Sequence, residues 1–286
     1  MKVSICTPTY NRRPFLPMII QCVQHQTYTG PIEWVIVDDG TDCIRDLVQD
    51  IPYVKYIRLH KKANLGYKRN VLHANCTGDI IVYMDDDDYY PPTRISHAVE
   101  KLTAGPELIA GSSIIHVYYP HLSKIIEFGP YGTNHATAGT FAFKKELLDI
   151  TSYQEEASMA EEKHFLKHYT LPMIQLDPLH VILVVCHPFN TVDKTKFLEN
   201  QGKPYPHTVE DILVNPDLYT FFTKTIHSIE YPEGSIEHKP DIAEYQHCLA
   251  NGNAFCVKMK DRVFTGNEII QVLNQQLVLL RKHRLL

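Results

Sequence analysis

The stretch that decides the fold of this 286-residue chain is Gly78-Asp79-Ile80-Ile81-Val82-Tyr83-Met84-Asp85-Asp86-Asp87-Asp88. Residues 80–84 predict a strand buried on both faces, and four aspartates follow that strand directly. Carboxylates placed so closely repel one another and need a compensating cation or wide solvation. Mg²⁺ or Mn²⁺ accepts a few carboxylate oxygens and fills its other positions with water and phosphate oxygens. The run therefore predicts a metal bridge to a diphosphate, with an acidic solvated loop as the alternative.

The same strand-then-helix pattern fills the sequence before this stretch. The predicted strands are residues 2–7, 33–37 and 54–59, and the predicted helices are residues 15–26, 43–49 and 68–74. Continuous apolar strands that alternate with helices indicate an α/β fold, a Rossmann-like, mostly parallel central sheet with helices on both faces. Ligands of such sheets gather beyond the carboxyl ends of the strands. The polar clusters 7–12, 38–41 and 85–88 should therefore converge on one rim.

The pattern loosens after Pro91-Pro92. We expect a helix over residues 93–102, a strand over 108–119 that forms a hairpin with 125–128, and a helix over 158–169. A further apolar run covers residues 181–185. Beyond residue 190 the chain is rich in Pro, His and Tyr and ends in a helical stretch over 267–284, so we predict a mainly helical or irregular C-terminal extension.

Composition excludes several classes of protein. The formal charge of -5 argues against a sequence-independent nucleic-acid binder, because such binding needs clustered Lys and Arg. The N-terminus lacks the features of a signal peptide, and no apolar run reaches the length of a membrane span. Seven cysteines without a CxxC pair fit neither a disulfide framework nor a zinc ribbon and are expected to be mostly buried thiols. We expect a cytoplasmic protein, either free or peripheral to a membrane.

Asp38-Asp39-Gly40-Thr41 also follows a predicted strand. One carboxylate there can accept the ring N–H of uracil and another can meet ribose hydroxyls. The alternative is a turn and helix N-cap, and both interpretations can hold, one aspartate for each. A phosphatase of the haloacid dehalogenase type is disfavoured, because Gly40 stands where its second catalytic acid belongs. Neither GxGxxG nor GxxxxGK[ST] is present, so a metal must do the work of a phosphate cradle.

Two further candidates lie in the second half of the chain. Glu161-Glu162 falls in the predicted helix 158–169, where a carboxylate could act as the base that takes a proton from an acceptor hydroxyl. Most Glu residues on helices are simply solvated. His187 follows the apolar run 181–185 and could bind a metal or a pyrophosphate, or could be an ordinary packed histidine. No HExxH pair indicates a zinc hydrolase.

Together these motifs resemble glycosyltransferase family 2, a group of nucleotide-sugar transferases with the GT-A fold. The matching segments are residues 3–12, 35–41 and 78–88, in the same order and spacing. The resemblance implies that Pro8, Tyr10 and Arg12 touch the nucleotide and that Asp39 faces uracil, with Asp38 beside it. Asn64-Leu65-Gly66 followed by Arg69-Asn70 resembles another segment of the family, which implies that Arg69 contacts the base or a phosphate.

The resemblance also assigns the acidic groups. The DxD element extends from Asp85 to Asp87, with Asp86 against the nucleotide-sugar, Asp87 as the foremost candidate for direct metal ligand and Asp85 as a second ligand. His187 is added to the metal set because of its place after the apolar run 181–185. Glu162 takes the place of the family's catalytic aspartate and is one methylene longer. Residues 1–100 would form the nucleotide-sugar half, 101–190 the acceptor half, and 191–286 the extension.

The resulting hypothesis is an inverting glycosyltransferase that uses Mn²⁺ or Mg²⁺. It would move a sugar from a nucleoside-diphosphate sugar, with UDP favoured, to a hydroxyl on a glycan or other acceptor. No nucleic acid and no transmembrane segment are expected. The alternatives are a nucleotidyl or phosphoryl transferase that uses the same aspartates, and a non-catalytic sugar-nucleotide or glycan-binding module.

Overall fold

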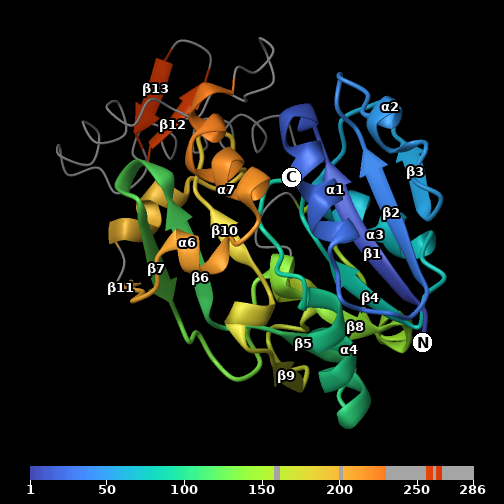
Figure 1. Cartoon of the computed structure of the whole chain (residues 1–286). Coiled ribbons are helices and arrows are strands. Elements are labelled where there is room, and N and C mark those ends of the chain that lie inside the picture. Colours follow the sequence, from blue (N-terminus) through green and yellow to red (C-terminus); the bar gives the residue numbers. More distant parts are fainter. Residues whose placement is uncertain (158–161, 200–201, 230–255, 260–261, 266–286) are drawn as a thin grey trace, which may run out of the picture. The chain divides into compact units, whose positions relative to one another are not determined.

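A computed structural model describes residues 1–157, 162–199, 202–229, 256–259 and 262–265 (Figure 1). The chain divides into two compact units, Met1–Ile229 and Glu230–Leu286. All candidate site residues belong to the first unit. The division of that unit into halves at residues 100 and 190 stays a prediction.

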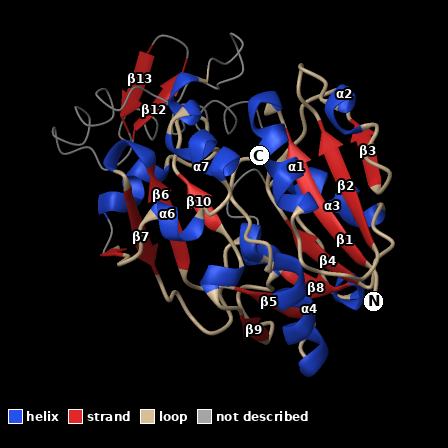
Figure 2. Ribbon diagram, viewed as in Figure 1, coloured by secondary structure: helices blue, strands red, loops and turns tan. Residues whose placement is uncertain are grey.

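The first unit is built around a mixed sheet that has seven strands in the described residues, in the order β3-β2-β1-β4-β8-β5-β9 (Figures 1 and 2). The strands are β1 (Val3–Thr9), β2 (Ile32–Asp38), β3 (Val54–Arg58), β4 (Ile80–Tyr83), β5 (Ile109–Gly111), β8 (Ala142–Lys144) and β9 (Met173–Gln175). β3, β2, β1 and β4 are parallel, whereas β8 is antiparallel to both β4 and β5. The predicted parallel sheet is confirmed for its first four strands.

Helices cover both faces of this sheet. The α-helices are α1 (Leu16–Gln24), α2 (Arg45–Val48), α3 (Leu65–Ala74), α4 (Arg94–Ala104), α5 (Glu162–Phe165), α6 (Val209–Ile212) and α7 (Pro216–Thr223). Short 3-10 helices are η1 (Arg13–Phe15), η2 (Pro120–Leu122), η3 (Ala138–Thr140), η4 (Lys145–Asp149), η5 (Pro178–His180), η6 (Lys194–Glu199) and η7 (Thr225–Ser228). Alternate strand residues such as Cys6, Val35 and Tyr83 share one buried cluster with Leu72 of α3. α1 and α4 lie over the opposite face (Figure 1).

A second sheet has the order β10-β6-β7-β11 and consists of β6 (Ile115–Tyr119), β7 (Lys124–Phe128), β10 (Leu183–Val185) and β11 (Lys203–Pro204). The predicted hairpin is present as β6 and β7. The single strand expected over 108–119 is wrong, because β5 and β6 belong to different sheets. In the segment that joins β5 to β6, hydrogen bonds with side chains take the place of strand pairing. Ser112 Oγ donates to the Ile114 carbonyl at 2.7 Å, and Ser113 N–H donates to the Gln175 side chain at 2.9 Å.

Two other boundaries differ from the sequence prediction. β1 continues through Pro8 and Thr9, which pair with β2, and the chain turns only at Asn11, whose φ is +53°. The helix expected over 158–169 is much shorter: in the described residues α5 ends at Phe165, and the three residues 167–169 all have left-handed backbones, with φ between 49° and 62°. Three consecutive left-handed residues cannot continue an α-helix.

The second unit contains an antiparallel pair, β12 (Cys256–Met259) and β13 (Arg262–Thr265), which the sequence pattern did not predict. The helix expected over 267–284 lies outside the described residues. Among those that are described, no helix combines the length and apolar character needed to cross a bilayer. Four of the five cysteines with described side chains are buried, as expected, and Cys43 is exposed.

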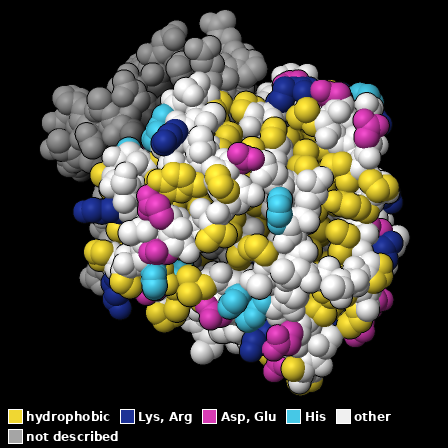
Figure 3. Space-filling model, viewed as in Figure 1, with side chains coloured by type: hydrophobic (Ala, Val, Ile, Leu, Met, Phe, Trp, Pro, Cys, Tyr) yellow, Lys and Arg dark blue, Asp and Glu magenta, His cyan; other side chains and the backbone are white. Residues whose placement is uncertain are grey.

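The surface shows no dominant charge of one sign on the face drawn in Figure 3. Acidic, basic and histidine side chains are dispersed there among apolar ones. The polar groups that could carry chemistry are instead buried at the carboxyl end of the first sheet, where Asp38, Asp39, Asp86 and Asp88 are each less than a tenth exposed.

Candidate active site

The polar clusters that follow β1, β2 and β4 meet at one rim, as the sequence predicted. β1 lies between β2 and β4 in the sheet, so the segments that leave the three strands are neighbours. Asn11 joins the first two, since its Oδ1 accepts from Thr41 N at 2.7 Å and Asp42 N at 3.1 Å. Arg12 joins the first to the third, because it approaches Asp86 and Asp87.

Two arginines approach the acidic run, residues 85–88, at longer range than a good hydrogen bond. Arg12 Nη2 lies 3.4 Å from Asp87 Oδ2, and its Nε lies 3.7 Å from Asp86 Oδ1. Arg69 Nη2 lies 3.7 Å from Asp85 Oδ1. A charge-assisted hydrogen bond would bring these atoms to about 2.7–2.9 Å. The guanidinium groups therefore reduce the repulsion within the run, and Arg12 Nη2 also donates to the Phe189 carbonyl at 2.5 Å.

Burial sets the protonation of the acidic run. Desolvation and the neighbouring charge of Asp87 raise the pKa of Asp86 to about 8, and desolvation raises the pKa of Asp88 to about 7 against the opposing charge of Lys194. Burial also acts on Asp87, but the hydrogen bond with His187 and the charge of Arg12 outweigh it and hold the pKa of Asp87 below its usual range. One buried oxygen, Asp86 Oδ2, has no hydrogen-bond partner among the described residues. A cation at this place would offset both the desolvation of the carboxylates and the missing partner of Asp86 Oδ2.

His187 lies two residues after the end of β10 (Val185) and is brought against the acidic run. Its Nε2 lies 3.1 Å from Asp87 Oδ2, and its Nδ1 accepts from Phe189 N at 3.3 Å. Burial lowers the pKa of His187 to about 4, with Asp87 opposing, so the ring is neutral near pH 7. Asn190 holds the segment by accepting from His187 N at 2.8 Å. Neutral imidazole is the form that binds metals.

Asp88 has a structural role. Its Oδ1 accepts from Val185 N at 2.8 Å, which connects the end of the acidic run to β10. Tyr89 extends this connection with two backbone hydrogen bonds to Leu183, of 2.9 and 3.1 Å. The same sheet-to-sheet junction therefore places both His187 and the last aspartate.

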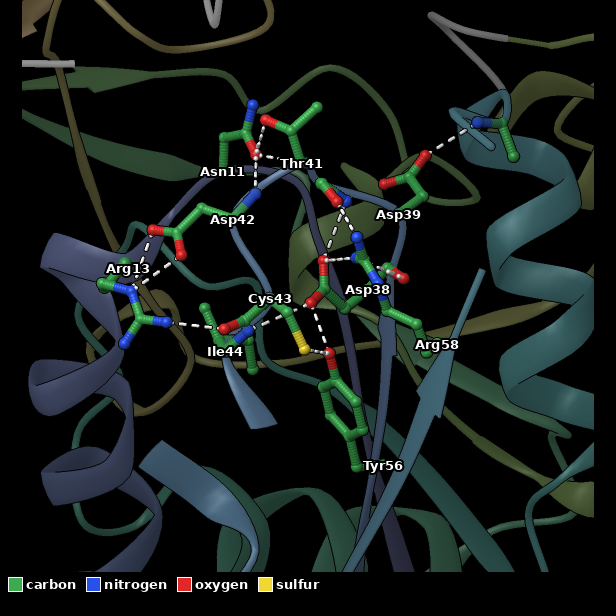
Figure 4. A network of polar contacts seen from close by, with 12 residues as sticks. Asn11, Arg13, Asp38, Asp39, Thr41, Asp42, Cys43, Ile44, Tyr56 and Arg58 are labelled. Carbon is green, nitrogen blue, oxygen red and sulfur yellow. Dashed lines mark hydrogen bonds and ion pairs between the residues drawn. The ribbon is translucent and has the colours of Figure 1, made fainter. Parts of the chain in front are cut away.

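Asp38 sits at the centre of a fully formed polar network (Figure 4). Its Oδ1 accepts from Gly40 N at 2.8 Å and pairs with Arg58 Nη1 at 2.9 Å, while its Oδ2 accepts from Tyr56 Oη at 2.5 Å and Ile44 N at 3.3 Å. The side chain is 1% exposed. These contacts fit the turn-and-cap interpretation of Asp38, because every lone-pair direction of its carboxylate points to a donor of the protein.

Asp39 and Tyr10 both lie near Lys68 at the rim. Asp39 Oδ1 pairs with Lys68 Nζ at 2.8 Å, and Asp39 Oδ2 accepts from Ala63 N at 2.8 Å. The partly exposed Tyr10 ring has Lys62 Nζ 4.7 Å and Lys68 Nζ 5.9 Å from its centroid. This corner therefore combines an aromatic face, cations and a carboxylate. Pro8, by contrast, is buried within β1 opposite Val37.

Arg69 and Asn70 connect the rim to the segment that precedes α5. The Arg69 guanidinium lies 4.4 Å from the centroid of Tyr83 and 5.8 Å from that of Tyr153. Asn70 holds the backbone of Tyr153 in both directions, donating to its carbonyl at 2.9 Å and accepting from its N–H at 3.0 Å. A β-carbon at Gly66 would collide with the Gln154 carbonyl, so glycine is required for this close approach.

Glu162 is the first described residue of α5 and is partly buried. Phe165, one turn further, anchors the helix by stacking on Tyr153 with centroids 4.4 Å apart and an interplanar angle of 7°. Because Tyr153 also lies beside Arg69, and Arg69 beside Asp85, these side chains connect α5 to the acidic run. Glu161, the other member of the predicted pair, lies outside the described residues.

Three residues of the site were missed by sequence reasoning. Lys68 pairs with Asp39, Asn190 supports His187, and the charge of Lys194 acts on Asp87, Asp88 and His187. Only Lys68 had a signal, because it directly precedes the Arg69-Asn70 pair. Within the described part of the chain, no three His, Cys, Asp or Glu side chains are already gathered as a metal ligand set.

The parallel sheet that ends on an aspartate run, with a second sheet beside it, defines a protein of the GT-A class. Two solved structures share this fold. One is the mannosyltransferase PcManGT from Pyrobaculum calidifontis in complex with GDP-Man and Mn²⁺, at a TM-score of 0.52 and 18% identity, covering 87% of this chain and 80% of that one. The other is S. aureus TarS 1-349 in complex with UDP, at a TM-score of 0.50 and 19% identity, covering 66% and 62%.

Residues 4–147 match the family described as Glycosyl transferase family 2. The chain belongs to that family. A curated relative, the GalNAc(5)-diNAcBac-PP-undecaprenol beta-1,3-glucosyltransferase of Campylobacter jejuni, is 26% identical over 197 residues, which cover 58% of this chain and 62% of the relative. The match spans only part of the curated relatives' length, 43 to 62% in three of them.

Proposed function

We propose that this chain is an inverting, metal-dependent glycosyltransferase that moves a sugar from a nucleoside-diphosphate sugar to a hydroxyl of a glycan. The observation that carries the proposal is the acidic run, 85–88, which lies at the rim of the sheet with Asp86 and Asp88 buried and with an unpartnered buried oxygen on Asp86. Such an arrangement suits a divalent cation and the diphosphate that the cation binds. The family supports the reaction class, and the Campylobacter relative, by its name, transfers glucose to a polyprenol-linked glycan.

Asp85, Asp87 and His187 would hold the metal. Two carboxylates and a neutral imidazole are a donor set that suits Mn²⁺, and a cation beside the buried, unpartnered Asp86 Oδ2 would favour the ionised form of Asp86. Gly139 leaves space at this place, because a β-carbon there would lie 3.1 Å from Asp85 Oδ2. When bound, the ion would supply Lewis-acid stabilisation of the diphosphate leaving group.

The nucleotide would lie along the β1 and β2 ends of the rim. Tyr10 offers a stacking face for the base, and the Asp39–Lys68 pair offers an acceptor and a donor to the edge of a uracil. Arg12 and Arg69 are within reach of phosphate oxygens in place of their 3.4–3.7 Å contacts with the run. In this arrangement Asp38 shapes the turn and does not contact the ligand. The TarS complex contains UDP and the PcManGT complex GDP-Man, and the Asp39 corner is our reason for favouring UDP.

Glu162 would take the proton of the acceptor hydroxyl as that oxygen attacks the anomeric carbon from the side opposite the diphosphate. A single in-line displacement inverts the anomeric centre and needs one base and no covalent intermediate. The anchoring of α5 through Phe165 and Tyr153 supports this role, because a base must be held in place to act.

A thermal-shift panel tests the nucleotide and metal together. A ligand that binds only the native state at 100 times its Kd stabilises the protein by about 2.7 kcal/mol. We expect UDP and a UDP-sugar to raise the melting temperature with Mn²⁺ present and to do so much less with a chelator. The accompanying product assay should detect UDP. Release of pyrophosphate or phosphate would indicate a nucleotidyl or phosphoryl transferase instead, and binding without turnover would indicate a non-catalytic module.

A further inference from the structure

Three aromatic rings form a compact cluster at the edge of the first unit, outside the nucleotide corner. The His135 ring lies between Tyr131, with centroids 5.1 Å apart, and Tyr169, with centroids 5.0 Å apart and an interplanar angle of 28°. Tyr131 is 54% exposed, the largest exposed fraction of any Tyr, Phe or Trp side chain in the described part of the chain. A large, exposed aromatic face on a well-ordered stack is a natural surface for a ligand.

The loop that carries Tyr131 and His135 is held firmly. The Gln175 side-chain amide donates to the Thr133 carbonyl at 2.7 Å and to the His135 carbonyl at 3.1 Å. Tyr131 N–H donates to the Ser113 carbonyl at 3.3 Å. Because these contacts fix the backbone before any ligand arrives, the aromatic surface is pre-organised, which lowers the entropic cost of binding.

The cluster is connected along the chain to both chemical centres of the proposed active site. The loop that leaves His135 runs to Gly139, whose β-carbon position is 3.1 Å from Asp85 Oδ2. On the other side, Tyr169 follows α5 within one compact turn, in which Leu166 N donates to the Glu162 carbonyl at 2.8 Å and Thr170 N to the Leu166 carbonyl at 3.2 Å. Burial and the negative charge of Glu162 raise the pKa of Tyr169, in keeping with that proximity.

The backbone around Tyr169 is strained in a way that active sites often show. Lys167, His168 and Tyr169 have φ of 49°, 58° and 62°, and none of them is a glycine. Such conformations persist only where the surrounding structure imposes them, and they cluster at ligand clamps. Here they bring the Tyr169 ring back over His135.

His135 adds a polar group to the cluster. Its Nδ1 is buried and has no hydrogen-bond partner in the described part of the chain. Burial lowers the pKa of His135, so the ring is neutral and can either donate or accept. If the Tyr131 side chain moved aside, a ligand hydroxyl could form a hydrogen bond with His135 Nδ1. That bond would compensate the cost of burying this nitrogen without a partner.

We propose that the cluster of Tyr131, His135 and Tyr169 binds a neutral pyranose ring of the acceptor. A pyranose has C–H groups that pack on an aromatic face, which carries partial negative charge, and hydroxyls at its edge for His135. The carboxylate of Glu162 beside Tyr169 disfavours an anionic sugar. The inference rests on the proposed function, since it places the acceptor between Glu162 and the acidic run.

Binding of methyl pyranosides tests the inference without turnover. We would measure saturation-transfer NMR and dissociation constants for the methyl β-pyranosides of glucose, galactose and N-acetylglucosamine, with UDP and Mn²⁺ present. We expect at least one to bind, Tyr131→Ala to raise its Kd by about fivefold or more, and Tyr131→Phe to stay within about twofold of the wild type. Tyr53→Ala is the matched control, because Tyr53 precedes β3 at the amino edge of the sheet, opposite the rim.

Unchanged pyranoside affinity in Tyr131→Ala, or no binding of any of the three sugars by the wild type, would overturn the inference. UDP titrations of the same proteins separate it from the proposed function. If UDP binds and the pyranosides do not, the inference fails alone. If a pyranoside binds through Tyr131 while UDP does not bind, the proposed donor is wrong and the pyranose site stands.

Discussion

Asp38-Asp39 and the acidic run Asp85–Asp88 look alike in the sequence and differ in the structure. Each follows a buried parallel strand and each reaches the same rim. The first pair meets its cations closely, at 2.9 Å for Arg58 and 2.8 Å for Lys68. The acidic run has longer separations from Arg12 and Arg69, of 3.4–3.7 Å.

This difference separates the structural carboxylate of Asp38 from the ligand site proposed at the acidic run. The donors around Asp38 come from its own turn and from β3, and they are complete without a ligand. In the acidic run, Asp86 has an unpartnered buried oxygen and a pKa raised to about 8. Its ionised form would therefore be stabilised by additional positive charge nearby. Position after a strand therefore indicates the rim, and the set of donors around Asp38 identifies it as the structural acid there.

The largest effect should come from the acidic run itself. We expect Asp87→Ala to lower kcat/KM for sugar transfer by about 10⁴-fold or more, because it removes a metal ligand and with it the stabilisation of the leaving group. The measurement is UDP release across a panel of UDP-sugars. Asp50→Ala, which removes an exposed carboxylate after α2, is the matched control and should behave as the wild type. Full activity in Asp87→Ala would remove the distinction between the two acidic regions.

The next effect concerns the base. Glu162→Gln should lower kcat by roughly 10³-fold while the affinity for UDP stays within about twofold, because the change removes proton transfer and leaves the nucleotide corner intact. Glu146→Gln, an exposed residue of η4, controls for the loss of an acidic side chain. Turnover at the wild-type rate would place the base elsewhere.

Asp38→Asn should act on stability. The substitution leaves Arg58 without its carboxylate and breaks the bond from Tyr56, so we expect the free energy of unfolding to fall by about 2–4 kcal/mol. Urea denaturation measures the change. The matched variant Asp86→Asn should lose little or no stability, because the pKa of Asp86 is raised to about 8 and its neutral form is already favoured in the folded protein. Equal losses in the two variants would contradict the comparison.

The smallest effect lies beneath the acidic run, at His73. Its Nε2 lies 2.5 Å from Tyr83 Oη, and burial, helped by the charge of Arg69, lowers its pKa from 6.5 to about 3. The unfolded chain therefore binds the extra proton between these values, and stability that is fully present above pH 6.5 is lost as the pH falls. The slope should be about 1.4 kcal/mol per pH unit from this residue. Urea denaturation at pH 6, 5 and 4 should show a shallower loss in His73→Gln; an identical slope would rule out His73 as the source.

Much of the first half of the fold could be predicted from the sequence. Apolar periodicity identified the strands that became β1 to β4, and parallel pairing then required their polar ends to meet. The change of sheet between β5 and β6 could not be predicted, since the groups that stabilise it, Thr140 and Gln175, are distant in sequence from Ser112. The end of α5 was equally hidden, because Lys167-His168-Tyr169 contains no glycine or proline to signal a left-handed turn.

The candidate site shows the same limit. The residue types of the acidic run and of the Asp38 turn could be identified from the sequence, because they occur in short contiguous motifs. Their partners could not, because Arg58, Asn190 and Lys194 reach the rim from other segments of the chain. Which aspartate is structural and which is free to bind depends on those partners, and so could be decided only from the folded structure.

The most direct test of a metal-dependent nucleotide site is a calorimetric titration of wild-type protein with UDP, once with Mn²⁺ and once with a chelator. The proposed role of the acidic run predicts that Mn²⁺ tightens UDP binding at least about tenfold, or roughly 1.4 kcal/mol. The same titration of Asp87→Ala should show no dependence on Mn²⁺. Equal UDP affinity of the wild type with and without the metal would contradict the account.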